Sequence, residues 1–319
     1  MKKLILHIGT HRCGSTAIQT MLDGLRSKFE ENNISIVMRS DMERGVLDFR
    51  RLHRFNRLNP MWIYKLRRLA DDIKRSASHT IVVSEENIMG TMPGVLSPDF
   101  YPYFPRLIGS FAFLVERLAP EWTVCPRLVV RRQDHYLESV YAFRVSRGLT
   151  LGFNDFLAQI DISSLSWVPF LDQLINLRDV CNVKIAALEM WHGDSAAKEA
   201  ARFLEISDVE DMEFQRLRGN RRHDPEALTF ILACNRMGID GSQVFDAKQA
   251  SLIDCAALVE QLGDQITPQQ RSQLISEISK PVELGFSASD RNSFLAVLED
   301  QNNEFLNHES VISNSAVWG

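Results

Sequence analysis

The chain of 319 residues has 45% hydrophobic side chains and a formal net charge of -5 at neutral pH. That length and apolar content are enough for a sizeable buried core, so we predict a globular protein. The negative balance argues against general nucleic-acid binding, and we expect no nucleic-acid partner.

Charge is distributed unevenly along the chain. Residues 39–75 carry eleven Lys and Arg against five Asp and Glu, whereas residues 246–319 carry four against eleven. Solvated helix faces are the ordinary explanation for such runs. The alternative is that an anionic substrate passes over the basic stretch.

The cysteines and the amino terminus bear on the compartment. The five cysteines are widely spaced, with no CxxC pair and no neighbouring histidines, so neither a disulfide framework nor a metal site is expected. The apolar run in "MKKLILHIG" is too short for a signal peptide, and no stretch approaches the roughly 20 apolar residues of a membrane helix. We expect a cytoplasmic protein without stable membrane insertion; no feature indicates an oligomeric state.

The first part of the chain alternates strands with helices. After a strand at residues 3–9, Ala17, Ile18, Met21 and Leu22 recur at helical spacing. Further strands are expected at residues 34–38, 80–84, 127–131 and 183–189, and further helices at 133–148 and 170–177. This alternation indicates an α/β fold with a mostly parallel central sheet covered on both faces.

The pattern becomes helical from Pro225 onward. Helical segments are expected at residues 225–238, 271–284 and 290–306, and residues 308–319 lack periodicity. Without a repeat or a low-complexity linker, we predict a single domain over residues 1–319. It would comprise an α/β core (1–224), a helical lobe or cap (225–307) and a loose tail (308–319).

A glycine turn follows the first strand, in "HIGTHRCGST" at residues 7–16. Gly9 and Gly14 match G-x-x-x-x-G, and Ser15 and Thr16 add hydroxyl donors. Between a strand and a helix, such a turn directs backbone N–H groups at an anion. A nucleoside-triphosphatase loop would have lysine where Ser15 stands, so a Mg-ATP kinase is the least favoured interpretation. A tight connection without a ligand is the structural alternative.

The turn resembles the 5'-phosphosulfate loop of sulfotransferases that use 3'-phosphoadenosine-5'-phosphosulfate (PAPS), especially bacterial and carbohydrate-modifying members. In that loop a Lys or Arg precedes a small residue and then Gly-Ser/Thr, and Arg12 takes the cation's place. The second signature of the family is a strand ending in arginine with a serine eight residues later, which together hold the 3'-phosphate. Arg131 and Ser139 in "VVRRQDHYLES" match it. The resemblance implies a three-layer P-loop-like fold.

The resemblance also implies a set of donor-binding residues. They are Gly9, Thr10, His11, Arg12, Cys13, Gly14, Ser15, Thr16, Arg131 and Ser139. Arg221 and Arg222 lie where relatives use a basic loop over the nucleotide, although a plain solvated loop is the alternative. Arg132 is a candidate assistant to Arg131, and Trp167 and Trp191 either stack on the donor or belong to the core.

Sulfuryl transfer requires a cation near the leaving phosphate and a base near the acceptor. Arg12 fits the first role, but arginine does not deprotonate and so cannot act as a general acid. Related enzymes use a glutamate in a Ser-x-Glu pattern after the third strand, and Glu86 matches that position behind Ser84. Glu85 is the rival, and a helix cap at "SEEN" is the structural alternative.

Two histidines lie close to the loop. His11 is either a second catalytic acid or base or a residue that shapes the loop, and we favour shaping. His7 is expected to be a core histidine within the strand.

The resemblance implies an enzyme that transfers a sulfuryl group from PAPS to a hydroxyl or amine of an acceptor. Analogy suggests a carbohydrate or glycolipid acceptor, and the basic stretch at residues 39–75 is compatible with an anionic one. A non-catalytic nucleotide-binding protein of the same fold is the alternative from another class.

Overall fold

The computed structural model describes residues 1–93, 98–177, 181–191, 193, 195–206, 224–239, 255–312 and 318. The chain divides into two compact units. Unit 1 comprises Met1–Arg132, Ile162–Gly219 and Val297–Gly319, and unit 2 comprises Gln133–Asp161 and Asn220–Ala296. Residues 133–161, which we expected within the core, thus group with the later helices.

Unit 1 is built on a six-stranded sheet in the order β2-β3-β1-β4-β5-β6, and every strand pair is parallel. Its strands are β1 (Lys2–Gly9), β2 (Ile34–Met38), β3 (Thr80–Ser84), β4 (Trp122–Val130), β5 (Lys184–Ala187) and β6 (Val311–Ile312). The predicted α/β class with a parallel, helix-covered sheet is confirmed.

The central strands end next to one another. His7 of β1 pairs with Ser84 of β3, and Gly9 of β1 pairs with Val129 of β4. After β1 the chain crosses toward β2 at one side of the sheet, and after β4 it crosses toward β5 at the other side. In open α/β sheets such a switch point is where ligands bind, beyond the carboxyl ends of the strands.

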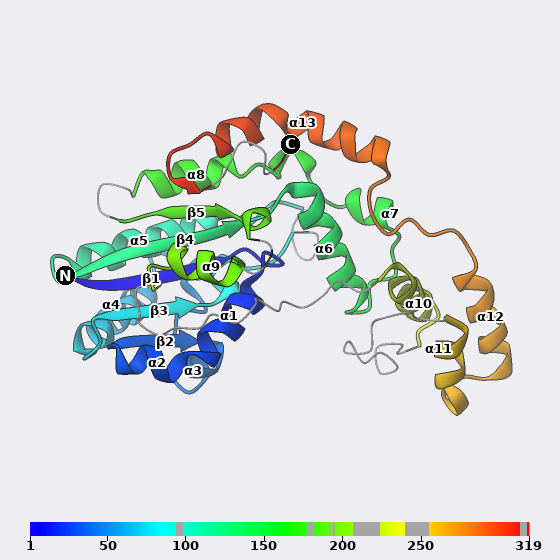
Figure 1. Cartoon of the computed structure of the whole chain (residues 1–319), viewed down its shortest axis with the longest axis horizontal. Helices are drawn as coiled ribbons and strands as arrows, with labels where there is room; N and C mark the ends of the chain where they lie inside the picture. The colour runs from blue at the N-terminus through cyan, green and yellow to red at the C-terminus, as the bar shows by residue number, and fades with distance from the viewer. Residues whose placement is uncertain are drawn as a thin grey trace. The chain divides into compact units, whose positions relative to one another are not determined.

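Helices cover both faces of this sheet (Figure 1). In right-handed crossovers, the direction in which the chain moves across the sheet decides which face the connecting helix covers. The chain moves one way from β1 to β2 and the other way from β2 to β3 and from β3 to β4. Helix α1 therefore covers the face opposite to the one covered by α4 and α5. Helix α9 contacts α1, and α5 contacts α4, α8 and β4. The helices of this unit are α1 (Ser15–Gly24), α2 (Arg26–Glu31), α3 (Arg39–Glu43), α4 (Pro60–Arg75), α5 (Phe104–Leu118), α8 (Val168–Ile175) and α9 (Ala196–Phe203).

Short 3-10 helices connect several of these elements. They are η1 (Leu52–Arg54), η2 (Glu86–Met89), η3 (Ile162–Ser164) and η4 (Leu188–Met190). Because α4 leads into β3 and α5 leads into β4, both helices run antiparallel to the strands. Their first turns therefore lie toward the carboxyl edge of the sheet.

Unit 2 is helical. It contains α6 (Gln133–Val145), α7 (Phe153–Leu157), α10 (Pro225–Arg236), α11 (Cys255–Gln261), η6 (Gly263–Gln265), α12 (Pro268–Ile278) and the first part of α13 (Ala288–Leu306). Buried Asp134 and Glu138 of α6 each form an ion pair at 2.6 Å with Arg291 of α13. The side-chain amide of Asn235 donates to the carbonyls of Val145 and Leu149 and ties α10 to the end of α6.

The segment that we expected to be a loose tail contains ordered elements. Strand β6 pairs with β5, and buried Trp318 stacks on Phe305 with 5.6 Å between the ring centroids. No helix in the described part of the chain is both long and apolar enough to cross a membrane.

Candidate functional site: an anion-binding loop beside a carboxylate

The glycine turn is fixed to the neighbouring strand. The Thr10 hydroxyl donates a 2.8 Å hydrogen bond to the Val129 carbonyl of β4, and the Cys13 amide donates to the Thr10 carbonyl at 3.2 Å. A Cβ on Gly9 would lie 1.8 Å from Ser15 Oγ, so only glycine fits where the chain passes the start of α1. The turn is therefore a tight, anchored loop.

The loop leaves donors available at the amino terminus of α1. Arg12 and Gly14 adopt left-handed backbone conformations, with φ of 65° and 80°. The backbone N–H groups of Gly14, Ser15 and Thr16 have no acceptor among the described residues, and buried Ser15 Oγ has no hydrogen-bond partner there. Adjacent N–H groups at the positive end of a helix form an anion-binding concavity.

Two arginines lie together at this loop. The Arg131 guanidinium donates to the Arg12 carbonyl at 3.4 Å, and both side chains are partly exposed. Arg131 follows β4 and Arg12 follows β1, so the switch point places both cations at one edge of the sheet. The structure thus brings the first predicted phosphate motif and the arginine of the second into contact.

Glu189 of η4 organises the turn after β4, and our sequence reasoning did not identify it. Its carboxylate accepts from the Arg132 backbone N–H at 3.0 Å and from Trp318 Nε1 at 2.9 Å, and it lies 3.9 Å from Arg131 Nε. No sequence motif marks this residue, because its partners come from β4 and from the end of the chain.

The two adjacent glutamates after β3 have different surroundings. Glu85 is 1% exposed and caps η2, since its carboxylate accepts from the Asn87 backbone N–H at 2.8 Å. Glu86 is partly exposed; burial and the charge of Glu85 raise its pKa, against the opposing effect of Arg12. Glu85 is thus the helix cap, and Glu86 is the carboxylate within electrostatic reach of the loop.

His11 is bonded within the protein on both sides. Its backbone N–H donates to the Tyr101 hydroxyl at 2.9 Å, its Nδ1 lies 3.1 Å from the same hydroxyl, and its ring also bonds to the Asn87 side chain. Burial lowers the pKa of His11 to about 4, so the ring is neutral at neutral pH. These contacts favour the loop-shaping role over the acid-base role. Tyr101 and Asn87, like Glu189, were not among the predicted site residues.

His7 lies beneath the loop. It is fully buried, its Nδ1 lies 2.8 Å from Ser84 Oγ, and burial lowers its pKa to about 4. It belongs to the core of the sheet.

The remaining predicted residues are Cys13, Trp167, Trp191, Ser139, Arg221 and Arg222. Cys13 is buried, and burial raises the pKa of its thiol to about 12, so it is not a thiolate. Trp167 is a core residue whose Nε1 donates to the Arg131 carbonyl at 2.9 Å, and Trp191 contacts Phe203. Ser139 lies on α6 of unit 2, so its pairing with Arg131 on one phosphate stays a prediction. Arg221 and Arg222 lie outside the described residues.

A scan against protein-family models and a search of the curated proteins both find no match to this chain. A functional assignment therefore depends on the geometry of the loop and on the residues around it.

Proposed function

We propose that the protein is a sulfotransferase that uses PAPS as the sulfuryl donor. One observation supports the proposal: a loop with available backbone N–H donors and an arginine lies within electrostatic reach of Glu86, a carboxylate whose pKa is raised. The loop suits a phosphosulfate, and the carboxylate suits an acceptor hydroxyl. Both belong to unit 1.

The chain's own groups fit such a donor. The free N–H groups of Gly14, Ser15 and Thr16 would donate to the 5'-phosphosulfate, together with the Arg12 guanidinium and the Thr16 hydroxyl. Arg131, next to the loop, would hold the 3'-phosphate, with Ser139 as its predicted partner. The donor supplies an activated sulfuryl group attached to its 5'-phosphate.

The proposed reaction balances with one proton transferred. A bond forms between the acceptor oxygen and sulfur while the bond between sulfur and the 5'-phosphate oxygen breaks. The Glu86 carboxylate accepts the acceptor proton, and its raised pKa makes it a better base than an exposed glutamate. Arg12 stabilises the charge that develops on the leaving phosphate, but donates no proton to it.

We further propose a hydroxyl or amine of a carbohydrate or glycolipid as the acceptor, and the cytoplasm as the compartment. Four cysteines with described side chains, Cys13, Cys125, Cys181 and Cys234, are free and buried, as suits a reducing environment.

Thermal denaturation with two nucleotides tests the donor assignment. Adenosine 3',5'-bisphosphate without metal should stabilise the protein, by about 2.7 kcal/mol at a hundredfold excess over Kd. Mg-ATP should give a smaller shift. Stabilisation by Mg-ATP alone would overturn the proposal and favour a kinase. Binding of the bisphosphate without transfer to any carbohydrate or lipid acceptor would identify a non-catalytic binding protein.

A further inference from the structure

The region from η1 to the second turn of α4 combines unpaired cations with exposed apolar side chains. Residues 49–70 contain seven Lys and Arg and no Asp or Glu. Six of the seven form no ion pair with any carboxylate of the described chain: Arg51, Arg54, Arg57, Lys65, Arg67 and Arg68. Arg50 alone is neutralised, by Asp48 at 2.9 Å.

Large apolar side chains protrude among these cations. Leu58 is 91% exposed, Met61 55% and Tyr64 64%. Leu58 lies just before α4, whereas Met61 and Tyr64 lie three residues apart on one side of its first turns, opposite the buried Leu66 and Leu69. We call the exposed Arg57, Leu58, Met61, Tyr64, Lys65, Arg67 and Arg68 the α4 surface. The α4 surface therefore exposes apolar side chains and cations side by side.

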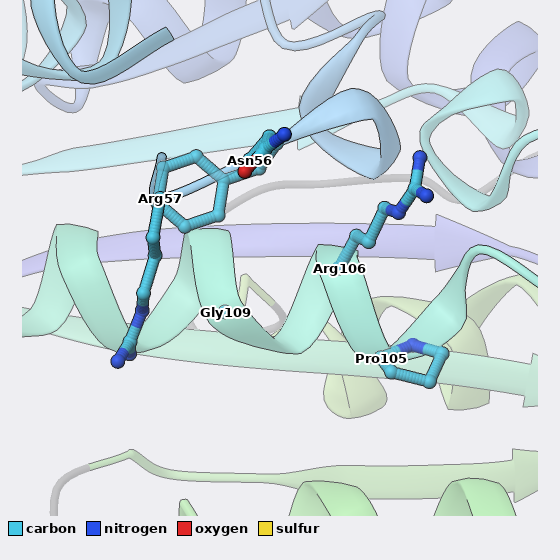
Figure 2. Close-up of a pocket in the computed structure, with 6 residues that line it drawn as sticks. Asn56, Arg57, Pro105, Arg106 and Gly109 are labelled. Atoms are coloured by element: carbon cyan, nitrogen blue, oxygen red, sulfur yellow. The ribbon is translucent and has the colours of Figure 1, made fainter. Parts of the chain in front are cut away.

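A shallow pocket adjoins the α4 surface at the first turns of α5. It is lined by Phe55, Asn56, Arg57, Pro105, Arg106 and Gly109. Figure 2 shows the Arg57 and Arg106 side chains extending from the pocket in different directions, so they suit two separate anionic groups better than one. Arg106 lies over the Tyr103 ring at 5.4 Å, and Tyr103 is itself 39% exposed. The mixture of cations and apolar groups thus continues from α4 to α5.

We propose that the α4 surface docks the protein on a membrane that contains anionic lipids. Unpaired Lys and Arg bind the headgroup phosphates, and protruding Leu, Met and Tyr enter the boundary between headgroups and acyl chains. A soluble polyanion would use the cations but would gain nothing from Leu58 and Met61. This combination therefore favours a lipid surface.

The topology aligns this surface with the candidate site. The first turns of α4 and α5 point toward the carboxyl edge of the sheet, which also carries the loop and Glu86. Tyr103 lies next to Gly90, directly after η2, where a Cβ would be 3.4 Å from the Tyr103 ring. If the proposed function holds, on which this point rests, the acceptor hydroxyl belongs to a lipid headgroup presented at the docked surface.

Vesicle co-sedimentation without donor nucleotide tests the docking. The full chain at about 0.1 M salt, where surface charges act over roughly 10 Å, is mixed with vesicles of phosphatidylcholine and phosphatidylglycerol in equal parts, or of phosphatidylcholine alone. We expect binding to the anionic vesicles and much weaker binding to the neutral ones. The double variant Arg67→Gln/Arg68→Gln should bind about 25-fold more weakly, at roughly fivefold per charge. The double variant Leu58→Ser/Met61→Ser should lose about tenfold.

Two control variants make the same changes in charge and in apolar side chains at other positions of the chain. Lys198→Gln/Arg202→Gln removes two exposed cations from α9, and Ile275→Ser/Val297→Ser removes two exposed apolar side chains. Both controls should bind like the parent. Absence of binding to anionic vesicles overturns the proposal. So does unchanged binding of Leu58→Ser/Met61→Ser, which would identify a site for soluble polyanions. Because no donor is present, the result is independent of sulfuryl transfer.

Discussion

The Nδ1 atom of His11 lies 3.1 Å from the hydroxyl of Tyr101, which also accepts the His11 backbone N–H. The Asn87 amide donates to Glu85, whose carboxylate also accepts the Asn87 backbone N–H. The tyrosine therefore holds both the backbone and the ring of His11 in the loop.

Tyr101→Phe should loosen the loop while leaving its charged groups in place. Loss of the hydroxyl leaves two buried groups of His11 unpaired, which should lower the free energy of unfolding by about 1–3 kcal/mol. The KM for the donor should rise, whereas the pH dependence of kcat should not change. Tyr141→Phe is the matched control, because its hydroxyl bonds the Leu151 carbonyl at 3.1 Å in unit 2. Equal effects of the two variants on KM would contradict the role of Tyr101.

Arg12 should be the most sensitive cation of the site. Arg12→Ala should lower kcat/KM by about 10²–10³-fold, the usual cost of removing one group that stabilises developing charge. Arg12→Lys should recover part of this loss, since lysine keeps the charge and can also donate a proton. Arg39→Ala, on exposed α3, removes another cation that acts on Glu86 and should change the rate only a few-fold. The measurement is kcat/KM from steady-state kinetics of the folded variants. An Arg12→Ala variant with parental activity would refute the role assigned to Arg12.

Glu86→Gln should remove the base and slow transfer by about 10²–10⁴-fold. In the parent, activity should rise with pH as Glu86 loses its proton, at a pH above that of an ordinary glutamate because its pKa is raised. The glutamine variant should lack this acidic limb.

Glu85→Gln distinguishes the two glutamates. Removing the Glu85 charge lowers the Glu86 pKa, so the acidic limb should move to lower pH while much of the activity remains. If Glu85→Gln instead abolishes transfer and Glu86→Gln does not, the base is Glu85. The measurement is kcat/KM from acidic to neutral pH in all three proteins.

Gly9→Ala should damage the loop more than its small volume suggests. The added methyl would lie 1.8 Å from Ser15 Oγ, so Ser15 and the start of α1 must shift. We expect a loss of about 1–3 kcal/mol in the free energy of unfolding and a weaker thermal shift with adenosine 3',5'-bisphosphate. Gly24→Ala, at the other end of α1, meets no atom within 4 Å and should be neutral or mildly stabilising. A Gly9→Ala protein that resembles Gly24→Ala would contradict the packing described for the loop.

The buried histidines predict a loss of stability in mild acid. The pKa values of His7 and His11 are lowered to about 4, from about 6.5 in the unfolded chain. Below about pH 6.5 the unfolded chain binds more protons, so the free energy of unfolding falls as the pH drops toward 4. His7→Gln should reduce this slope in urea titrations across that range. An unchanged slope would mean that His7 does not contribute.

Sequence periodicity predicted the sheet because its strands are short apolar runs buried on both faces. Strands β2 and β3 have the expected limits, whereas β4 begins at Trp122 rather than Arg127. Pro126 interrupts the apolar pattern of β4, but it pairs only with β1, since pairing with β5 starts at Arg127. Helix α5 was not predicted. Its Gly109 and Pro105 weaken the helical signal, although Gly109 leaves room for the Phe55 ring.

The candidate site was predictable only where its residues are adjacent in sequence. The loop and the glutamate pair follow strands directly, so their neighbourhood follows from a parallel sheet. Tyr101 reaches the loop from 90 residues away, and Glu189 reaches the Arg132 amide from 57 residues away. No periodicity marks such contacts, because tertiary folding alone creates them.

The hydrogen bond from Thr10 to Val129 joins the loop after β1 to the strand that ends beside Arg131. Adjacent strands are held about 4.8 Å apart by their ladder, so the interval between the two basic positions is set by the sheet and not by the ligand. If the proposed donor binds here, the sheet would favour nucleotides whose two charged ends match this fixed interval.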